Sequence, residues 1–197
     1  RGGSLRDLRD VSLLKNKGIC DMCGRLAVEE HLAHELTNLV LPKMRDSNLG
    51  RVLYISSVLG FVAMPLRGPY VASKFAIEGL VSTLRLELKN TNIKLSVIQP
   101  GPIESKFRQN AYKAFKENVE TSNSHFLNQY QPMIKRLKSG KNVKFTLPPE
   151  VVLKCTIHAL ESNSPKNYYR VTFPTKLFAF LGNILPSKLM DNILNKT

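Results

Sequence analysis

The sequence has few cysteines and no apolar run of the roughly 18 residues that a membrane-spanning helix needs. Its first residues, from Arg1 to Arg6, lack the apolar core of a secretory signal. Cys20, Cys23 and Cys155 are too few, and odd in number, for a disulfide framework. We therefore expect reduced thiols and a cytoplasmic location. The chain also begins without methionine, which favours a start inside a longer polypeptide.

No dense basic run accompanies the high positive charge of the chain. The 197 residues carry 29 Lys and Arg against 15 Asp and Glu, a formal charge of +14. Most of this excess lies after residue 50 and is scattered along predicted helices without an interleaved aromatic motif. Such an excess affects solubility and non-specific association rather than fold. We expect no nucleic-acid partner.

The middle of the chain reads as alternating strands and helices. Apolar residues at helical spacing predict a helix over 28–45, and two β-rich runs predict strands. A strand, a helix and a strand with short connections form a βαβ unit, which requires a parallel sheet covered by helices. The fold class is therefore α/β, a Rossmann-like doubly wound sheet. After the first helix, the predicted elements are a strand at 51–56, a helix at 70–89 and a strand at 93–98.

The rest of the chain is predicted to be mostly helical, in one domain. Thr146 is a plausible cap for the helix that opens at Pro148 and Pro149. Residues 1–27 have no clear period, whereas 28–197 have the pattern of one α/β domain whose tail, 173–197, is apolar and helical. The remaining predicted elements are helices at 105–118 and 124–139, a strand at 168–172, and a tail helix at 174–194 interrupted at Pro186.

Three polar side chains form the candidate catalytic site. Tyr70 and Lys74 are four residues apart in a helical pattern and so share one face. Ser57 follows a strand, at the sheet edge where open α/β folds place ligands. A free tyrosine has a pKa of about 10, and a nearby ammonium draws it down toward the range useful for acid–base work. These groups suit carbonyl reduction, in which Ser57 holds the oxygen and Tyr70 supplies a proton.

These residues resemble the catalytic arrangement of the short-chain dehydrogenase/reductase family. The resemblance rests on Tyr70-x-x-x-Lys74, on Ser57 thirteen residues before the tyrosine, and on the segment Pro100-Gly101-Pro102-Ile103-Glu104-Ser105 after the next strand. It implies that Tyr70 is the general acid/base and that Lys74 lowers its pKa and binds the nicotinamide ribose. It also implies that Ser57 orients the substrate. The implied cofactor-binding residues are Tyr70, Lys74, Pro100, Gly101, Ile103 and Ser105.

The same resemblance sets expectations for cofactor, substrate and partners. It implies an oxidoreductase that uses NAD(P), with NADP favoured over NAD, to interconvert an aldehyde or ketone and an alcohol. The apolar tail favours a small apolar substrate and a homo-oligomer. An amphipathic tail of this kind also fits peripheral contact with a membrane surface.

The family's Gly-rich phosphate-binding turn is absent from the first 50 residues. Glu29 and Leu32 also stand where the family's catalytic asparagine and a following glycine are expected. Two explanations remain open. In the first, the chain is a fragment, with the first strands of the dinucleotide-binding half lacking and an aberrant N-terminal segment. In the second, it is a degenerate member that has lost cofactor binding and serves as a non-catalytic binding or assembly partner.

Four zinc-type side chains lie near the start of the chain. Cys20 and Cys23 precede His31 and His34, but the gap of seven residues is shorter than the roughly 12–15 of a common zinc finger. We expect no metal.

Overall fold

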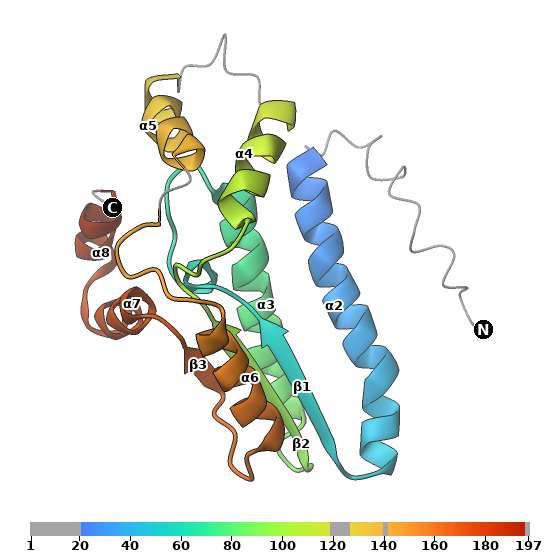
Figure 1. Cartoon of the computed structure of the whole chain (residues 1–197). Coiled ribbons are helices and arrows are strands. Elements are labelled where there is room, and N and C mark those ends of the chain that lie inside the picture. The colour runs from blue at the N-terminus through green and yellow to red at the C-terminus, as the bar shows by residue number, and fades with distance from the viewer. Residues whose placement is uncertain (1–20, 119–126, 140–141, 196–197) are drawn as a thin grey trace.

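A computed structural model describes residues 21–118, 127–139 and 142–195, with side chains from residue 32 onward. The described elements alternate as the sequence pattern predicts (Figure 1). In chain order they are α2 (Asp21–Asp46), β1 (Gly50–Ile55), the 3₁₀ helix η2 (Val58–Gly60), α3 (Gly68–Glu87), β2 (Ile93–Gln99), α4 (Phe107–Asn118), α5 (Leu127–Lys138), α6 (Glu150–Glu161), β3 (Tyr168–Arg170), α7 (Phe173–Ile184) and α8 (Ser187–Leu194).

The described strands form one parallel sheet in the order β1-β2-β3. The register pairs Gly50 with Ile93 and Ile55 with Ile98, so β1 and β2 end at the same edge. Within the described part of the chain β1 pairs with β2 alone, and Ile55 at its end is half exposed. The carboxyl ends of the strands therefore meet where β1 leads into η2 and β2 leads toward α4.

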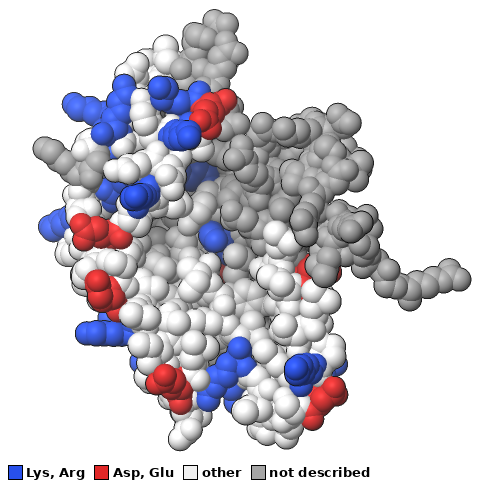
Figure 2. Space-filling view, turned by 45° about the vertical axis from the view of Figure 1, so that its right-hand side comes forward, with Lys and Arg blue, Asp and Glu red and all other residues white. Residues whose placement is uncertain are grey.

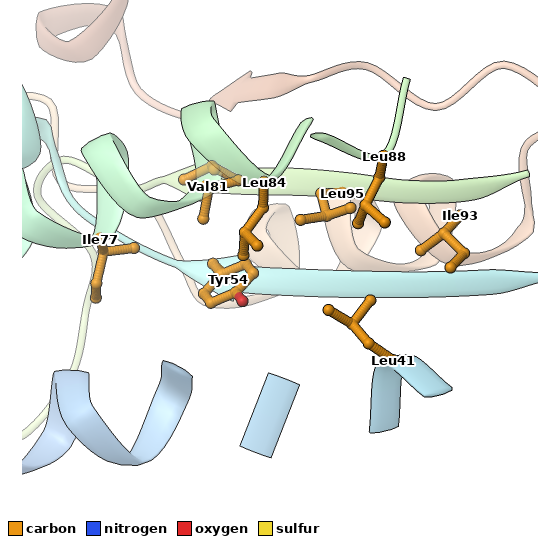
Figure 3. Close-up of a cluster of buried hydrophobic side chains, with 9 residues drawn as sticks. Leu41, Tyr54, Ile77, Val81, Leu84, Leu88, Ile93 and Leu95 are labelled. Carbon is orange, nitrogen blue, oxygen red and sulfur yellow. The ribbon is translucent and has the colours of Figure 1, made fainter. Parts of the chain in front are cut away.

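One face of the sheet is covered by α2 and α3 (Figure 1). Val97 of β2 is fully buried and points to this face, against Val81 of α3. Tyr54 of β1 lies between the two helices, as Figure 3 shows. The buried cluster comprises Leu41, Tyr54, Ile77, Val81, Leu84, Leu88, Ile93, Leu95 and Val97.

The opposite face is covered by α6. Ile98 follows Val97 along β2 and, because successive strand side chains point to opposite faces, it packs with Ala159 of α6 and Tyr169 of β3. Helices on both faces are what a buried parallel strand requires, and β2 is buried at every position except Lys94. The predicted α/β class with a parallel sheet between helices is confirmed.

Two local predictions differ from the structure. The first helix begins at Asp21, seven residues before the predicted start at Val28. Thr146 does not cap α6: its hydroxyl donates to the Val143 carbonyl at 2.7 Å, and Pro149 occupies the N-cap position without a side-chain cap. Thr146 therefore stabilises its own turn, one of several competing uses of a threonine hydroxyl.

A buried tyrosine links β1 to α2. The Tyr54 hydroxyl is hydrogen-bonded to Thr37 Oγ1, and Thr37 also donates to the Ala33 carbonyl at 2.7 Å. Burial raises the pKa of Tyr54 above its ordinary value, and the hydrogen bond with Thr37 offsets part of this effect. The neutral phenol is thus favoured in the folded state.

Tyr54 should make the stability of the chain fall at alkaline pH. Because its folded pKa is raised, its contribution is fully present below the unfolded pKa of about 10 and is lost as the pH rises through the folded pKa. The Tyr54→Phe variant should lose about 1 kcal/mol at pH 7 and show a flatter decline above pH 10. Urea unfolding between pH 7 and 11 measures both effects, with Tyr130→Phe on α5 as the control. Equal alkaline slopes for Tyr54→Phe and the parent chain would contradict this prediction.

Candidate active site

Ser57 lies directly beyond β1, at the carboxyl edge of the sheet. Backbone hydrogen bonds hold the segment that carries Ser57. The Ser56 amide donates to the Ile98 carbonyl at 2.8 Å, and the Val58 amide donates to the Pro100 carbonyl at 2.8 Å. Ser57 has an extended backbone and is the N-cap of η2, where its Oγ accepts the Leu59 amide at 3.1 Å. A hydroxyl that accepts through oxygen keeps its hydrogen to donate. Ser57 is half-buried and can offer that hydrogen to a carbonyl oxygen.

Tyr70 and Lys74 lie in the first two turns of α3, as predicted. The helix begins at Gly68, and Pro69 lies in its first turn. A backbone N–H there has no partner within the helix, so proline, which lacks that N–H, fits without loss of a hydrogen bond. The Lys74 ammonium lies 5.7 Å from the centre of the Tyr70 ring. Both residues are half-buried. At this distance the ammonium makes a cation–π contact with the Tyr70 ring.

Close packing at Gly60 brings η2 against this face of α3. A Cβ on Gly60 would lie 2.4 Å from Ser56 Oγ and 3.0 Å from Glu78 Cγ, so only glycine fits between the loop and the helix. Glu78 is one turn beyond Lys74 and therefore lies in the same row as Tyr70. The structure thus brings η2, which Ser57 caps, beside the face of α3 that carries Tyr70 and Lys74.

The segment after β2 forms a second wall. The Leu147 amide donates to the Pro102 carbonyl at 3.1 Å, and the Leu147 carbonyl accepts from the Glu104 amide at 2.9 Å. These two bonds form a parallel β-bridge between Ile103 and Leu147. Because these bonds use the peptide groups on either side of Ile103, its own N–H and C=O point away from Leu147. Ser105, the other residue predicted to meet the cofactor, is exposed, and its Oγ accepts the Phe107 amide at 3.3 Å.

Gly101 is held against two threonines that sequence reasoning missed. A Cβ at this position would lie 2.1 Å from Thr172 Oγ1 and 2.7 Å from Thr175 Oγ1. Both threonines are fully buried, and their hydroxyls are hydrogen-bonded to each other at 2.9 Å. Thr172 is the N-cap residue of α7, so the C-terminal part of the chain supports the loop after β2.

A buried polar group lies behind the site. Gln99, the last residue of β2, donates to Glu78 Oε1 at 3.0 Å. Its own Oε1 and the Ser56 hydroxyl oxygen are buried and have no hydrogen-bond partner. Buried polar atoms are normally hydrogen-bonded, so these two oxygens are exceptions in the described part of the chain. The sequence carried a signal for Gln99, a polar residue in an otherwise apolar buried strand.

An arginine beside Tyr70 was also missed. Arg67 is the N-cap residue of α3, and its Nη1 donates to Met64 Sδ at 2.7 Å. Burial lowers the pKa of the Arg67 guanidinium, and two further arginines, Arg136 and Arg108, lower it more. Tyr70 acts in the opposite direction, because a phenolate attracts the Arg67 charge. By the same attraction, Arg67 favours the phenolate of Tyr70.

The described residues give no support to metal binding. They contain no group of three or more His, Cys, Asp and Glu side chains that could hold a metal ion. Cys20 lies outside the described residues, and the side chains of Cys23 and His31 are likewise outside them. His34 is hydrogen-bonded to Asn38 at 3.2 Å and lies 3.8 Å from Glu35.

The tail is helical with a break at Pro186, as predicted, and forms α7 and α8. Phe180 and Ile184 of α7 and Leu189 of α8 are exposed. In the part of the chain that the structure describes, no helix has both the length and the apolar character to cross a membrane.

The fold and these loops together define a Rossmann-like protein with a serine, tyrosine and lysine at the carboxyl edge of its sheet. A family model described as short chain dehydrogenase matches residues 32–116. The chain is also 38% identical over 162 residues to the uncharacterized oxidoreductase YbbO of Escherichia coli. The chain belongs to the short-chain dehydrogenase/reductase family.

Solved structures agree on the fold. A short chain dehydrogenase from Burkholderia cenocepacia in complex with NADP matches 86% of this chain with a TM-score of 0.59 and 17% identity. A short chain dehydrogenase/reductase from Burkholderia phymatum in complex with NAD matches 89% with a TM-score of 0.59 and 21% identity. These family members thus include proteins with NAD and with NADP, and neither is favoured for this chain by the comparison.

The chain spans about half the length of the curated relatives it matches. The alignment with YbbO covers 82% of this chain and 54% of YbbO. The two Burkholderia structures are covered to 61% and 59% of their lengths. The activity of a whole family member is therefore a proposal for this chain.

Proposed function

We propose that this chain carries the catalytic residues of an NAD(P)-dependent oxidoreductase that interconverts an aldehyde or ketone and an alcohol. The observation that carries the proposal is the position of Ser57 beside the face of α3 that holds Tyr70 and Lys74. Hydroxyl, phenol and ammonium groups that meet at the carboxyl edge of a parallel sheet are suited to stabilise a developing alkoxide.

Each residue has a distinct role in the proposed reaction. Ser57 donates its hydroxyl hydrogen to the substrate oxygen, since the bond from the Leu59 amide uses a lone pair and leaves that hydrogen available. Tyr70 then transfers its phenolic proton to the same oxygen as negative charge builds there. Lys74 and Arg67 stabilise the phenolate that remains.

The loop after β2 fits the amide end of a nicotinamide. The peptide N–H and C=O of Ile103 point away from Leu147 and so can serve a ligand that has both a donor and an acceptor. Lys74 would hold the ribose, while Pro100, Gly101 and Ser105 would shape the remainder of this wall. When bound, NAD(P)H supplies the hydride to the carbonyl carbon.

An apolar substrate is supported by the surroundings of Tyr70. The ring of Phe107 lies 5.7 Å from the ring of Tyr70, and Phe107 is more than half exposed. Phe145 and Phe173 form a second exposed pair, with ring centres 5.1 Å apart. Exposed aromatic rings of this kind supply apolar contact area for a ligand.

The test is hydride transfer by the purified chain. NADPH and NADH are titrated separately while nicotinamide fluorescence is followed, which is simplified because the chain contains no tryptophan. Aliphatic aldehydes and ketones are then added, and the oxidation of the nicotinamide is measured by its absorbance. We expect binding of at least one cofactor and oxidation that depends on the carbonyl compound.

A second candidate function, a non-catalytic binding or assembly partner, is favoured by residues 1–50, which lack the Gly-rich phosphate-binding turn of the family. Saturable cofactor binding with turnover excludes that function. The absence of binding for both cofactors, in a chain that melts cooperatively, would overturn the enzymatic proposal and support the second one.

A further inference from the structure

Three arginines from separate elements lie close enough for their charges to interact beside the start of α3. Arg67 is at the start of α3, and Arg108 is the second residue of α4, directly after Phe107, whose ring contacts that of Tyr70. Arg136 lies in the last turn of α5. The helices α4 and α5 pack together through Phe115 and Tyr130, with ring centres 5.5 Å apart.

The charges of these arginines act on one another. Burial and Arg136 both lower the pKa of Arg108, and burial, Arg136 and Arg108 lower that of Arg67. The ion pairs found among the described residues join Lys113 to Glu117 and His34 to Glu35. Within this part of the chain, neither Arg67 nor Arg136 is paired with a carboxylate. Like charges that lie close together repel one another, and an anion bound among them would relieve that repulsion.

Further basic residues extend this cluster along α5. Lys135 and Lys138 line a hollow together with Ile134. Lys138 and Lys116 both lie over the ring of Tyr112, at 5.8 and 5.9 Å from its centre. In Figure 2 the Lys and Arg side chains gather over the upper part of the molecule, where α4 and α5 lie in Figure 1. The carboxylate of Glu104, in the loop before α4, accepts a hydrogen bond from the Asn142 side-chain amide at 3.4 Å.

We propose that the substrate of this site carries a carboxylate or phosphate group, which Arg67, Arg108 and Arg136 bind while the reacting carbonyl lies at Tyr70. The inference rests on the proposed function, because it places the substrate by the same tyrosine. Guanidinium groups bind carboxylates and phosphates through paired hydrogen bonds, and the exposed ring of Phe107 supplies an apolar surface beside them. The substrate class is therefore an anionic amphiphile, an oxo or hydroxy compound with an apolar body and an acidic end.

The test compares the binding of decanoate and of 1-decanol to the full chain by calorimetry, without cofactor, at low and high salt. The variants are Arg136→Gln and Arg108→Gln, with Arg45→Gln as the matched control. Arg45 is exposed in the last turn of α2, next to the start of β1 and so at the opposite end of the sheet. We expect decanoate to bind at least tenfold more tightly than 1-decanol. Arg136→Gln should remove about a factor of ten for decanoate and leave 1-decanol unchanged.

Other results would overturn the inference. They are equal affinities for the acid and the alcohol, no binding of decanoate, or an equal loss in Arg136→Gln and Arg45→Gln. A titration of the same variants with NADPH and NADH tests the other source of a phosphate: if Arg136→Gln weakens NADPH alone, the arginines serve the cofactor and not the substrate. Because decanoate binding needs neither cofactor nor turnover, failure here is distinguishable from failure of the proposed reduction.

Discussion

Replacement of Tyr70 by phenylalanine should lower carbonyl reduction by about 10²–10⁴-fold, the range that a positioned acid–base group contributes. The substitution removes one oxygen and keeps the ring that contacts Phe107. Ser57 can still donate to the substrate oxygen, but the phenolic proton of residue 70 is no longer available when the alkoxide forms. The loss should therefore appear in kcat more than in KM, because the proton is needed in the transition state and hardly in the ground state.

The control for this experiment is Tyr112→Phe on α4. Tyr112 is a half-buried tyrosine whose ring lies beside Lys116 and Lys138, so it shares the cationic neighbourhood without belonging to the proposed catalytic set. Both variants should melt within a few degrees of the parent chain. Unchanged turnover in Tyr70→Phe, or an equal loss in Tyr112→Phe, would contradict the assignment of Tyr70 as the acid.

Replacement of Gly101 by alanine should destabilise the chain by about 1–3 kcal/mol, the usual effect of forcing extra atoms into a packed position. The new Cβ would lie 2.1 Å from Thr172 Oγ1, and neither threonine can turn outward because both are fully buried. Either the loop after β2 or the start of α7 must move. Urea unfolding measures the loss of stability.

The matched control is Gly79→Ala in α3, where an added Cβ meets nothing within 4 Å. This helix position should gain about 0.5–1 kcal/mol, because alanine has less conformational freedom to lose than glycine. The double variant Gly101→Ala with Thr172→Ala should recover part of the loss, since it removes the clashing hydroxyl. Equal stability of Gly101→Ala and Gly79→Ala would show that the loop accommodates the methyl group.

The fold class and the placement of the candidate residues could be predicted because their signals are local. Tyr70 and Lys74 are one helical turn apart, and Ser57 follows a β-rich run, so spacing alone places all three at the carboxyl edge of a parallel sheet. The break at Pro186 is likewise local, because proline cannot continue a helix. The structure confirms these placements, while the chemical roles of the residues stay predictions.

The partners of these residues could not be predicted because they come from distant parts of the chain. Thr172 supports Gly101 from 71 positions away, and Arg136 acts on Arg67 from 69 positions away. Neither interaction follows from periodicity or composition. The misplaced role of Thr146 has a similar cause, since a threonine near a helix start can cap it or can bond within its own turn, and only the backbone path decides.

Strand β1 lies at the edge of the described sheet and ends beside Ser57, so the pairing of a further strand with β1 bears on the segment that carries Ser57. One ladder, with β2, aligns the strand that ends beside Ser57. The peptide groups on the other side of β1 can template a further strand. A strand that pairs there binds only the folded form of β1, so its binding free energy adds to the stability of the native sheet. The native position of Ser57 exists only in the folded sheet, so a strand that pairs with β1 raises the population of chains in which Ser57 is correctly placed, without contact between the two.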